Sequence, residues 1–245
     1  MVVGSKAVPL LIDCSMQKTK HGTAPVQEGN ALENVNNHIA IAGKVCSEFA
    51  FSHEVYGEGF YRFEVEIERL SEATDILPVT VSERIVDLAN LTIGTWVYVV
   101  GQIRSYNNYV EADRRNKLVL TVFARDIEIL EDNPSQQDIN PNEAYLNGFI
   151  CKLPIYRTTP FGREIADMLL AVNRPYNKSD YIPCIAWGRN ARFGGKLKVG
   201  DNIRIWGRMQ SRPYQKRHEN GDVQDKIAYE VSVSKIEAND ESEEG

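Results

Sequence analysis

The 245 residues are more than one small barrel needs and suit two domains, if a domain takes ~100–200 residues. Hydrophobic residues make up 42% of the chain and charged residues 25%, so the chain can bury a sizeable core. No stretch approaches the ~18 consecutive apolar residues of a membrane helix, and the apolar run at residues 7–12 is too short for a signal peptide. The four cysteines lack the CxxC spacing of zinc sites, and a disulfide framework is not expected in a chain of this size. The composition therefore predicts a soluble, cytoplasmic protein without a metal or other cofactor.

The net charge of −6 argues against a nucleic-acid ligand only if the charge is evenly distributed. It is not: residues 38–131 have a net charge of −6 and residues 132–144 one of −3. Residues 145–237 carry sixteen basic and nine acidic side chains, a net charge of +7. One segment is therefore basic and flanked by acidic sequence, a pattern that favours binding to a polyanion.

The chain resembles itself at an offset of about 105 residues, the signature of an internal repeat. A shift of 105 places Asp75–Val81 on Asp180–Ala186, and a shift of 106 places Gly94 on Gly200. The offset changes by only four residues over five blocks that keep their order. We interpret this as a duplication of one unit of about 95 residues.

The sequence of each copy predicts five strands and a short helix. Apolar residues alternate with charged ones at residues 63–68 in the first copy and at residues 203–210 in the second, the period-2 pattern of half-buried strands. A stretch of helical character follows the third strand, at Glu83–Leu91 and Arg189–Leu197, with a glycine shortly after each. Five strands with one helix between the third and the fourth are typical of the OB-fold. The predicted fold class is all-β, with two tandem OB-fold barrels.

The boundaries follow from composition. We predict a flexible arm at 1–33, a first OB-fold at 34–131, a linker at 132–144, a second OB-fold at 145–237 and a disordered acidic tail at 238–245.

The second copy combines the features that single-stranded nucleic acid requires. Aromatic side chains on which bases can stack lie beside a basic strand face that can follow phosphates. Taken singly, a strand aromatic is more often core and a strand arginine more often a solvated surface residue. The conjunction favours binding, with two polar loops, Tyr176–Asp180 and Tyr214–Asp225, that could close over a strand. The proposed phosphate contacts are Arg174, Arg189, Arg204, Arg208 and Arg212.

Residues 169–176 (LLAVNRPY), 180–188 (DYIPCIAWG) and 200–212 resemble the bacterial single-stranded-DNA-binding protein family. The resemblance covers most of residues 145–237 and reaches the first copy only through the repeat. It implies an OB-fold that binds single-stranded DNA without sequence preference, in an assembly with four such folds; for this chain that would be a homodimer. The family's base-stacking positions fall on Tyr176, Tyr181, Trp187 and Tyr214. Trp206 matches no usual stacking position and could equally serve an oligomer surface.

The repeat carries these four positions back to Ser71, Ile76, Ser82 and Asn108. Tyr106 and Tyr109 lie near Asn108, so three of the four stacking positions are missing from the first copy. Because the same copy is acidic, we predict that it binds DNA poorly and serves subunit or protein contact, with Trp96 and Tyr98 exposed for that role. The acidic end of the chain also lacks the hydrophobic tip by which family members recruit replication and repair enzymes.

No His, Cys or Ser pair has the spacing of a catalytic site, so no enzyme is predicted. The expected function is protection of single-stranded DNA in replication, recombination or repair. Two alternatives stay open: a protein–protein or primosome-like OB module, and a single-stranded RNA binder, since stacking and phosphate contacts do not read the sugar.

Overall fold

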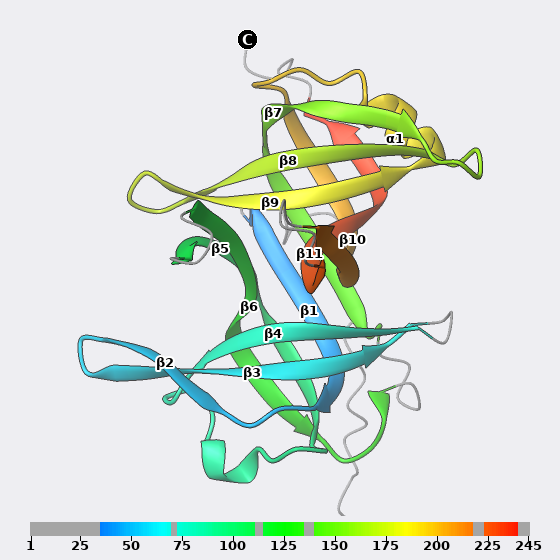
Figure 1. Cartoon of the computed structure of the whole chain (residues 1–245). Coiled ribbons are helices and arrows are strands. Elements are labelled where there is room, and N and C mark those ends of the chain that lie inside the picture. Colours follow the sequence, from blue (N-terminus) through cyan, green and yellow to red (C-terminus); the bar gives the residue numbers. More distant parts are fainter. Residues whose placement is uncertain (1–34, 70–72, 111–114, 135–139, 218–222, 240–245) are drawn as a thin grey trace, which may run out of the picture.

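The computed structural model describes residues 35–69, 73–110, 115–134, 140–217 and 223–239 (Figure 1). These residues are mostly β-strand, and the all-β prediction is confirmed. The predicted arm at 1–33 and residues 240–245 of the predicted tail lie outside the described residues.

The first half of the chain forms six strands. They are β1 (Asn37–Val45), β2 (Ala50–Val55), β3 (Glu58–Glu68), β4 (Thr74–Ser82), β5 (Trp96–Val110) and β6 (Arg115–Leu130). Five of them pair in a closed circuit, β1–β3–β4–β6–β5 and back to β1, in which only β4–β6 is parallel. Alternation explains the arrangement: Phe63, Val65 and Ile67 of β3 are buried, while the glutamates between them face outward.

The second half repeats this pairing order. Its elements are β7 (Asn142–Thr158), β8 (Glu164–Arg174), β9 (Lys178–Trp187), α1 (Gly188–Gly194), β10 (Asn202–Arg217) and β11 (Val223–Ala238). The circuit is β7–β8–β9–β11–β10 and back to β7, and again only one pairing, β9–β11, is parallel.

Strands β1 and β7 join the halves. They pair antiparallel from Asn37 opposite Leu146 to Ile41 opposite Asn142, with Ile39 opposite Ala144 at the centre. Figure 1 shows the result, with β8 and β9 crossing the upper half of the view and β3 and β4 crossing the lower half. The two halves thus share one 11-stranded sheet.

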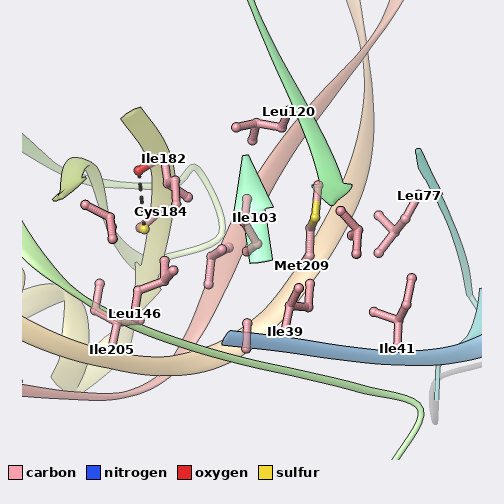
Figure 2. Packing of buried hydrophobic residues seen from close by; sticks show 14 of the residues in the cluster. Ile39, Ile41, Leu77, Ile103, Leu120, Leu146, Ile182, Cys184, Ile205 and Met209 are labelled. Atoms are coloured by element: carbon pink, nitrogen blue, oxygen red, sulfur yellow. Dashed lines mark hydrogen bonds between the residues drawn. The ribbon is translucent and has the colours of Figure 1, made fainter. Parts of the chain in front are cut away.

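The hydrophobic core is also continuous across the halves. Figure 2 shows Leu77 and Ile41 at one end of the cluster, Ile182, Cys184, Leu146 and Ile205 at the other, and Ile39, Ile103 and Met209 between them. Two asparagines mark the same place in each half. The Asn37 amide bonds to the backbone N–H and C=O of Ile103, and the Asn142 amide bonds to those of Met209. Shared sheet and shared core make the halves one unit.

The helices differ from the prediction. In the first half, the stretch predicted to be helical contains only a 3₁₀ turn, η1 (Leu88–Asn90), because the Asp87 carboxylate accepts the Ala89 N–H and favours a tight turn. In the second half, α1 begins at Gly188 and ends at Gly194, three residues before the predicted end. Gly94 and Gly200 do not end helices. Both have φ near +100° (96° and 98°) and form turns that lead into β5 and β10.

Two connections also differ. The predicted linker is shorter than 132–144, since β7 begins at Asn142; residues 135–139 lie outside the described part. The segment Tyr214–Asp225, predicted to be a closing loop, largely belongs to a hairpin in which Tyr214 of β10 pairs with Lys226 of β11.

Candidate nucleic-acid interface

The two predicted stacking residues on β9 share one face of the strand. Tyr181 and Trp187 are six residues apart, so the period of two places them on the same side as Pro183, while Ile182, Cys184 and Ala186 point into the core. Tyr181 is 45% exposed and Trp187 40% exposed. Each therefore has ring surface available at the outer face of the β8–β9 pair.

Tyr176 lies at the turn between β8 and β9. The turn is tight, because Arg174 and Lys178 still pair across it, and Tyr176 and Asn177 both adopt positive φ, 63° and 53°. This conformation is unusual for a tyrosine and leaves its ring 93% exposed. The predicted loop is thus a short turn that presents one aromatic ring.

Tyr214 lies on β10, 38% exposed, at the wall of a cavity of about 210 Å³. The cavity is lined mainly by apolar surface from both halves: Leu118, Val119 and Leu120 of β6, Pro183 of β9, and Ile227, Ala228 and Tyr229 of β11. Tyr214 therefore lies where the two halves meet.

Arg208, a predicted phosphate contact, points to the other half of the molecule. It donates to Asp75 of β4 at 3.2 Å, and the same buried carboxylate accepts a two-pronged interaction from Arg69 and the Ser211 backbone N–H at 2.7 Å. Partial burial lowers the pKa of Arg208, and Arg69 lowers it further. We call these four residues the Asp75 cluster.

Arg174, another predicted phosphate contact, belongs to a matching group. The buried Asp180 carboxylate accepts from Arg174 at 3.4 Å, from Arg104 of β5 at 3.0 Å and from the Ser105 backbone N–H at 2.7 Å. Burial is the main cause that lowers the pKa of Arg104. We call these four residues the Asp180 cluster. Each cluster joins the halves through one aspartate and two arginines.

The other three predicted phosphate contacts differ among themselves. Arg212 is held by both carboxylate oxygens of Glu230, at 3.1 and 3.2 Å, and this hydrogen bonding raises its pKa. Arg204 contacts Glu237 at 3.5 Å. Arg189 is exposed on α1 and has no carboxylate partner among the described residues. Arg189 is therefore the arginine of the five whose charge is least compensated.

The remaining aromatic candidates lie away from β9. Trp206 packs against Tyr145, with ring centroids 5.2 Å apart, and the Lys235 ammonium lies 4.4 Å from its ring. It lines a separate hollow of about 320 Å³ with residues such as Asn140 and Arg208. Trp96 and Tyr98, predicted to be exposed, are instead half-buried. Lys44 covers Trp96 at 4.8 Å, and burial raises the pKa of Tyr98.

Sequence reasoning missed the two aspartates that organise the clusters. The repeat contained the signal: the offset of 105 that aligns Asp75 with Asp180 also aligns Arg69 with Arg174. What it could not give was the partner from the other half, since Arg208 and Asp75 are 133 residues apart. Within the described residues, no group of His, Cys, Asp and Glu has the arrangement of a metal site, and no helix there is long and apolar enough to cross a membrane.

Comparison with known proteins agrees with the second half's motifs. The model of the single-strand binding protein family matches residues 141–238. Single-stranded DNA-binding protein 1 of Staphylococcus aureus is 37% identical over 81 residues, 30% of this chain and 48% of that protein. Single-stranded DNA-binding protein A of Bacillus subtilis is 36% identical over 81 residues, 30% of this chain and 47% of that protein. The chain thus spans about half the length of the curated relatives it matches.

The fold of the whole chain also has a counterpart. The crystal structure of the wild-type single-stranded DNA binding protein from Thermus aquaticus superposes with a TM-score of 0.67 at 17% identity, over 85% of this chain and 95% of that one. At this identity the likeness concerns the fold alone. The motif-bearing residues 169–212 lie inside the segment that matches the single-strand binding protein family, so the family likeness of this chain rests on its residues 141–238.

Proposed function

We propose that the protein binds single-stranded DNA without sequence specificity, mainly through its second half, and that each half is an OB-fold barrel. The observation that carries the proposal is the outer face of β9, where Tyr181 and Trp187 present their rings in line. Base stacking on such rings contributes roughly 1–3 kcal/mol per base and tolerates any base. The mechanism is equilibrium binding without chemistry.

The arginines have unequal parts in this proposal. Arg189 meets phosphate directly, since it has no competing carboxylate among the described residues. Arg204 and Arg212 are partly exposed and must share their charge with Glu237 and Glu230. Arg174 and Arg208 contribute mainly to the positive potential near the junction, because buried aspartates hold their guanidinium groups.

The biological setting belongs to the same proposal. A protein that coats single strands serves replication, recombination or repair, and a homodimer of this chain would present four barrels, two of them strong binding sites. Replication or repair proteins would be its partners, and the cytoplasm of a bacterium its location.

Titration of the full chain with fluorescent oligo-dT at several salt concentrations tests the function. We expect tight binding. The logarithm of the association constant should fall steeply with the logarithm of the salt concentration, because phosphate contacts release counterions. A flat salt dependence, or an absence of binding at low salt, contradicts the proposal. Competition with oligo-U and with duplex DNA separates a DNA binder from an RNA binder, and the mass of the complex in solution gives the number of chains that hold one strand.

A further inference from the structure

The Asp75 and Asp180 clusters stand at two places where a bound strand could pass from one half to the other. Each has the same backbone contacts. At the Asp180 cluster, the Tyr181 N–H donates to Ser105 Oγ at 2.7 Å. At the Asp75 cluster, the Ile76 N–H donates to Ser211 Oγ at 3.2 Å. The two junctions therefore differ in side chains and not in backbone construction.

At the Asp180 cluster, aromatic rings occur on both sides of the junction. Tyr181 belongs to the second half, and Tyr106, 38% exposed, follows Ser105 in the first half. Arg62 of β3 lies beside Tyr106: its guanidinium donates to the phenol oxygen at 2.6 Å and is 5.9 Å from the ring centre. Arg62 is exposed and has no carboxylate partner within the described ranges. Ring and cation together offer one base and one phosphate a place to bind.

In the first half, aromatic and basic side chains continue from Arg62 in one direction only. On the outer face of its sheet, the half-buried Phe123 has the guanidinium groups of Arg104 and Arg125 at 6.0 and 5.5 Å from its ring. Phe60, which is buried, packs 5.7 Å from Phe123 and supports that ring. In the other direction from Arg62, β3 presents Glu64, Glu66 and Glu68. A strand that entered at Tyr106 would be attracted toward the arginines beside Phe123 and repelled by the glutamates.

At the Asp75 cluster, the matching described positions carry neither the ring nor the unpaired arginine. Ile76 occupies the place of Tyr181, and Arg212 follows Ser211 where Tyr106 follows Ser105. Glu230 neutralises Arg212 through both of its oxygens. Among the described residues, the positions that match Tyr181 and Tyr106 thus carry no aromatic ring here, and the charge of Arg212 is compensated.

We infer that Tyr106 and Arg62 form a single-stranded-DNA subsite on the first half, and that the strand crosses from Tyr181 to this subsite at the Asp180 cluster and not at the Asp75 cluster. The inference rests on the proposed function. It assigns the first half one contact at the junction, although that half lacks three of the four stacking positions predicted from the family. It also gives the bound strand a single route through a molecule whose two junctions are built alike.

Binding of two oligo-dT lengths tests the route. A short oligomer of ~10 nucleotides occupies the second half alone, and one of ~30 reaches the first half, at ~4–16 nucleotides per OB-fold. Tyr106→Ala should leave the affinity for the short oligomer unchanged and weaken that for the long one about 5- to 100-fold, the loss of one stacked base. Tyr106→Phe should retain the wild-type affinity, because it keeps the ring.

The matched control is Tyr56→Ala, a fully exposed tyrosine at the β2–β3 turn of the same half. It should change neither affinity. If Tyr106→Ala behaves like Tyr56→Ala at both lengths, the route is wrong; if wild type binds neither oligomer, the proposed function itself fails.

Photocross-linking with 5-iododeoxyuridine provides a second readout that does not depend on affinity. With the long oligomer we expect adducts at Tyr181 and Tyr106. Adducts at Ile76 or Arg212 in their place would put the crossing at the other junction and overturn the inference.

Discussion

The two halves of the chain share a pairing order of strands and differ in what the outer faces of these strands carry. In the second half, β9 presents Tyr181 and Trp187 on its outer face. Its counterpart in the first half, β4, has Ile76 and Ser82 at the aligned positions, and the Ser82 hydroxyl is bound to Glu58. The aligned core positions of both strands are filled with apolar side chains. Packing therefore constrains the inner faces alike and leaves the outer faces free to diverge.

The contacts between the halves, by contrast, are alike at the Asp75 and Asp180 clusters. Each junction has a buried aspartate that accepts from one arginine of its own half, one arginine of the other half and a serine N–H. A buried charge is costly unless it is paired and hydrogen-bonded, so each member of the group depends on the others. We conclude that the two aspartate clusters stabilise the contact between the halves. DNA binding, as proposed, depends instead on the side chains of the outer strand faces.

Loss of one buried aspartate should have the largest effect. Asp180→Asn leaves Arg104 and Arg174 without their carboxylate, and we expect the free energy of unfolding to fall by about 3 kcal/mol, the lower end for a broken buried pair because the arginines are partly exposed. Asp75→Asn should cost about the same. Urea denaturation measures both. Asp167→Asn, which breaks the more exposed pair with Arg157, serves as the control and should cost less than about 1 kcal/mol. Unequal losses at Asp75 and Asp180 would show that the junctions are not energetically alike.

Variants of the aligned residues Tyr181 and Ile76 test whether the outer faces of β9 and β4 differ in DNA binding. Tyr181→Ala should weaken oligo-dT binding by about 1–3 kcal/mol through the loss of a stacked base. Ile76→Ala, the same truncation at the aligned position of the first half, should change binding by less than about 0.5 kcal/mol, as expected away from a binding site. Fluorescence anisotropy at one salt concentration measures both variants. Equal effects would mean that the two faces bind DNA equivalently.

The sequence predicted the strand face that carries Tyr181 and Trp187 better than it predicted the contacts around that face. Alternation on β9 and the family motif together locate Tyr181 and Trp187, because strand period and residue type are local properties. Arg208 was predicted to be a free phosphate contact, yet its carboxylate partner lies in the other half, and no local pattern reveals a partner so distant in the chain. The helix expected at 83–91 does not form, because the nearby Asp87 side chain competes for backbone N–H groups. The repeat predicted which residues correspond, and the junctions became visible only when the two copies were placed side by side.

A smaller effect should distinguish the arginines Arg189 and Arg84, which the offset of 105 aligns. Arg189→Gln should reduce the slope of the logarithm of affinity against the logarithm of salt concentration by about one, since one phosphate contact is lost. Arg84→Gln should leave the slope unchanged, because Arg84 is paired with Glu58 at 3.3 Å. Salt titrations of the two variants and of wild type provide the slopes. A normal slope for Arg189→Gln would remove this arginine from the phosphate contacts.

The smallest expected change is spectroscopic, and it follows from where the three tryptophans lie. Trp187 is on the outer face of β9, whereas Lys44 covers Trp96, and Lys235 and Tyr145 cover Trp206. A base that stacks on an indole quenches its fluorescence, so oligo-dT should quench wild type and Trp96→Phe to the same extent in absolute signal. Trp187→Phe should lose most of this quenching while it keeps most of the affinity, because phenylalanine still offers a ring. If Trp206→Phe abolishes the quenching instead, the strand lies over the hollow beside Trp206 and not over the outer face of β9.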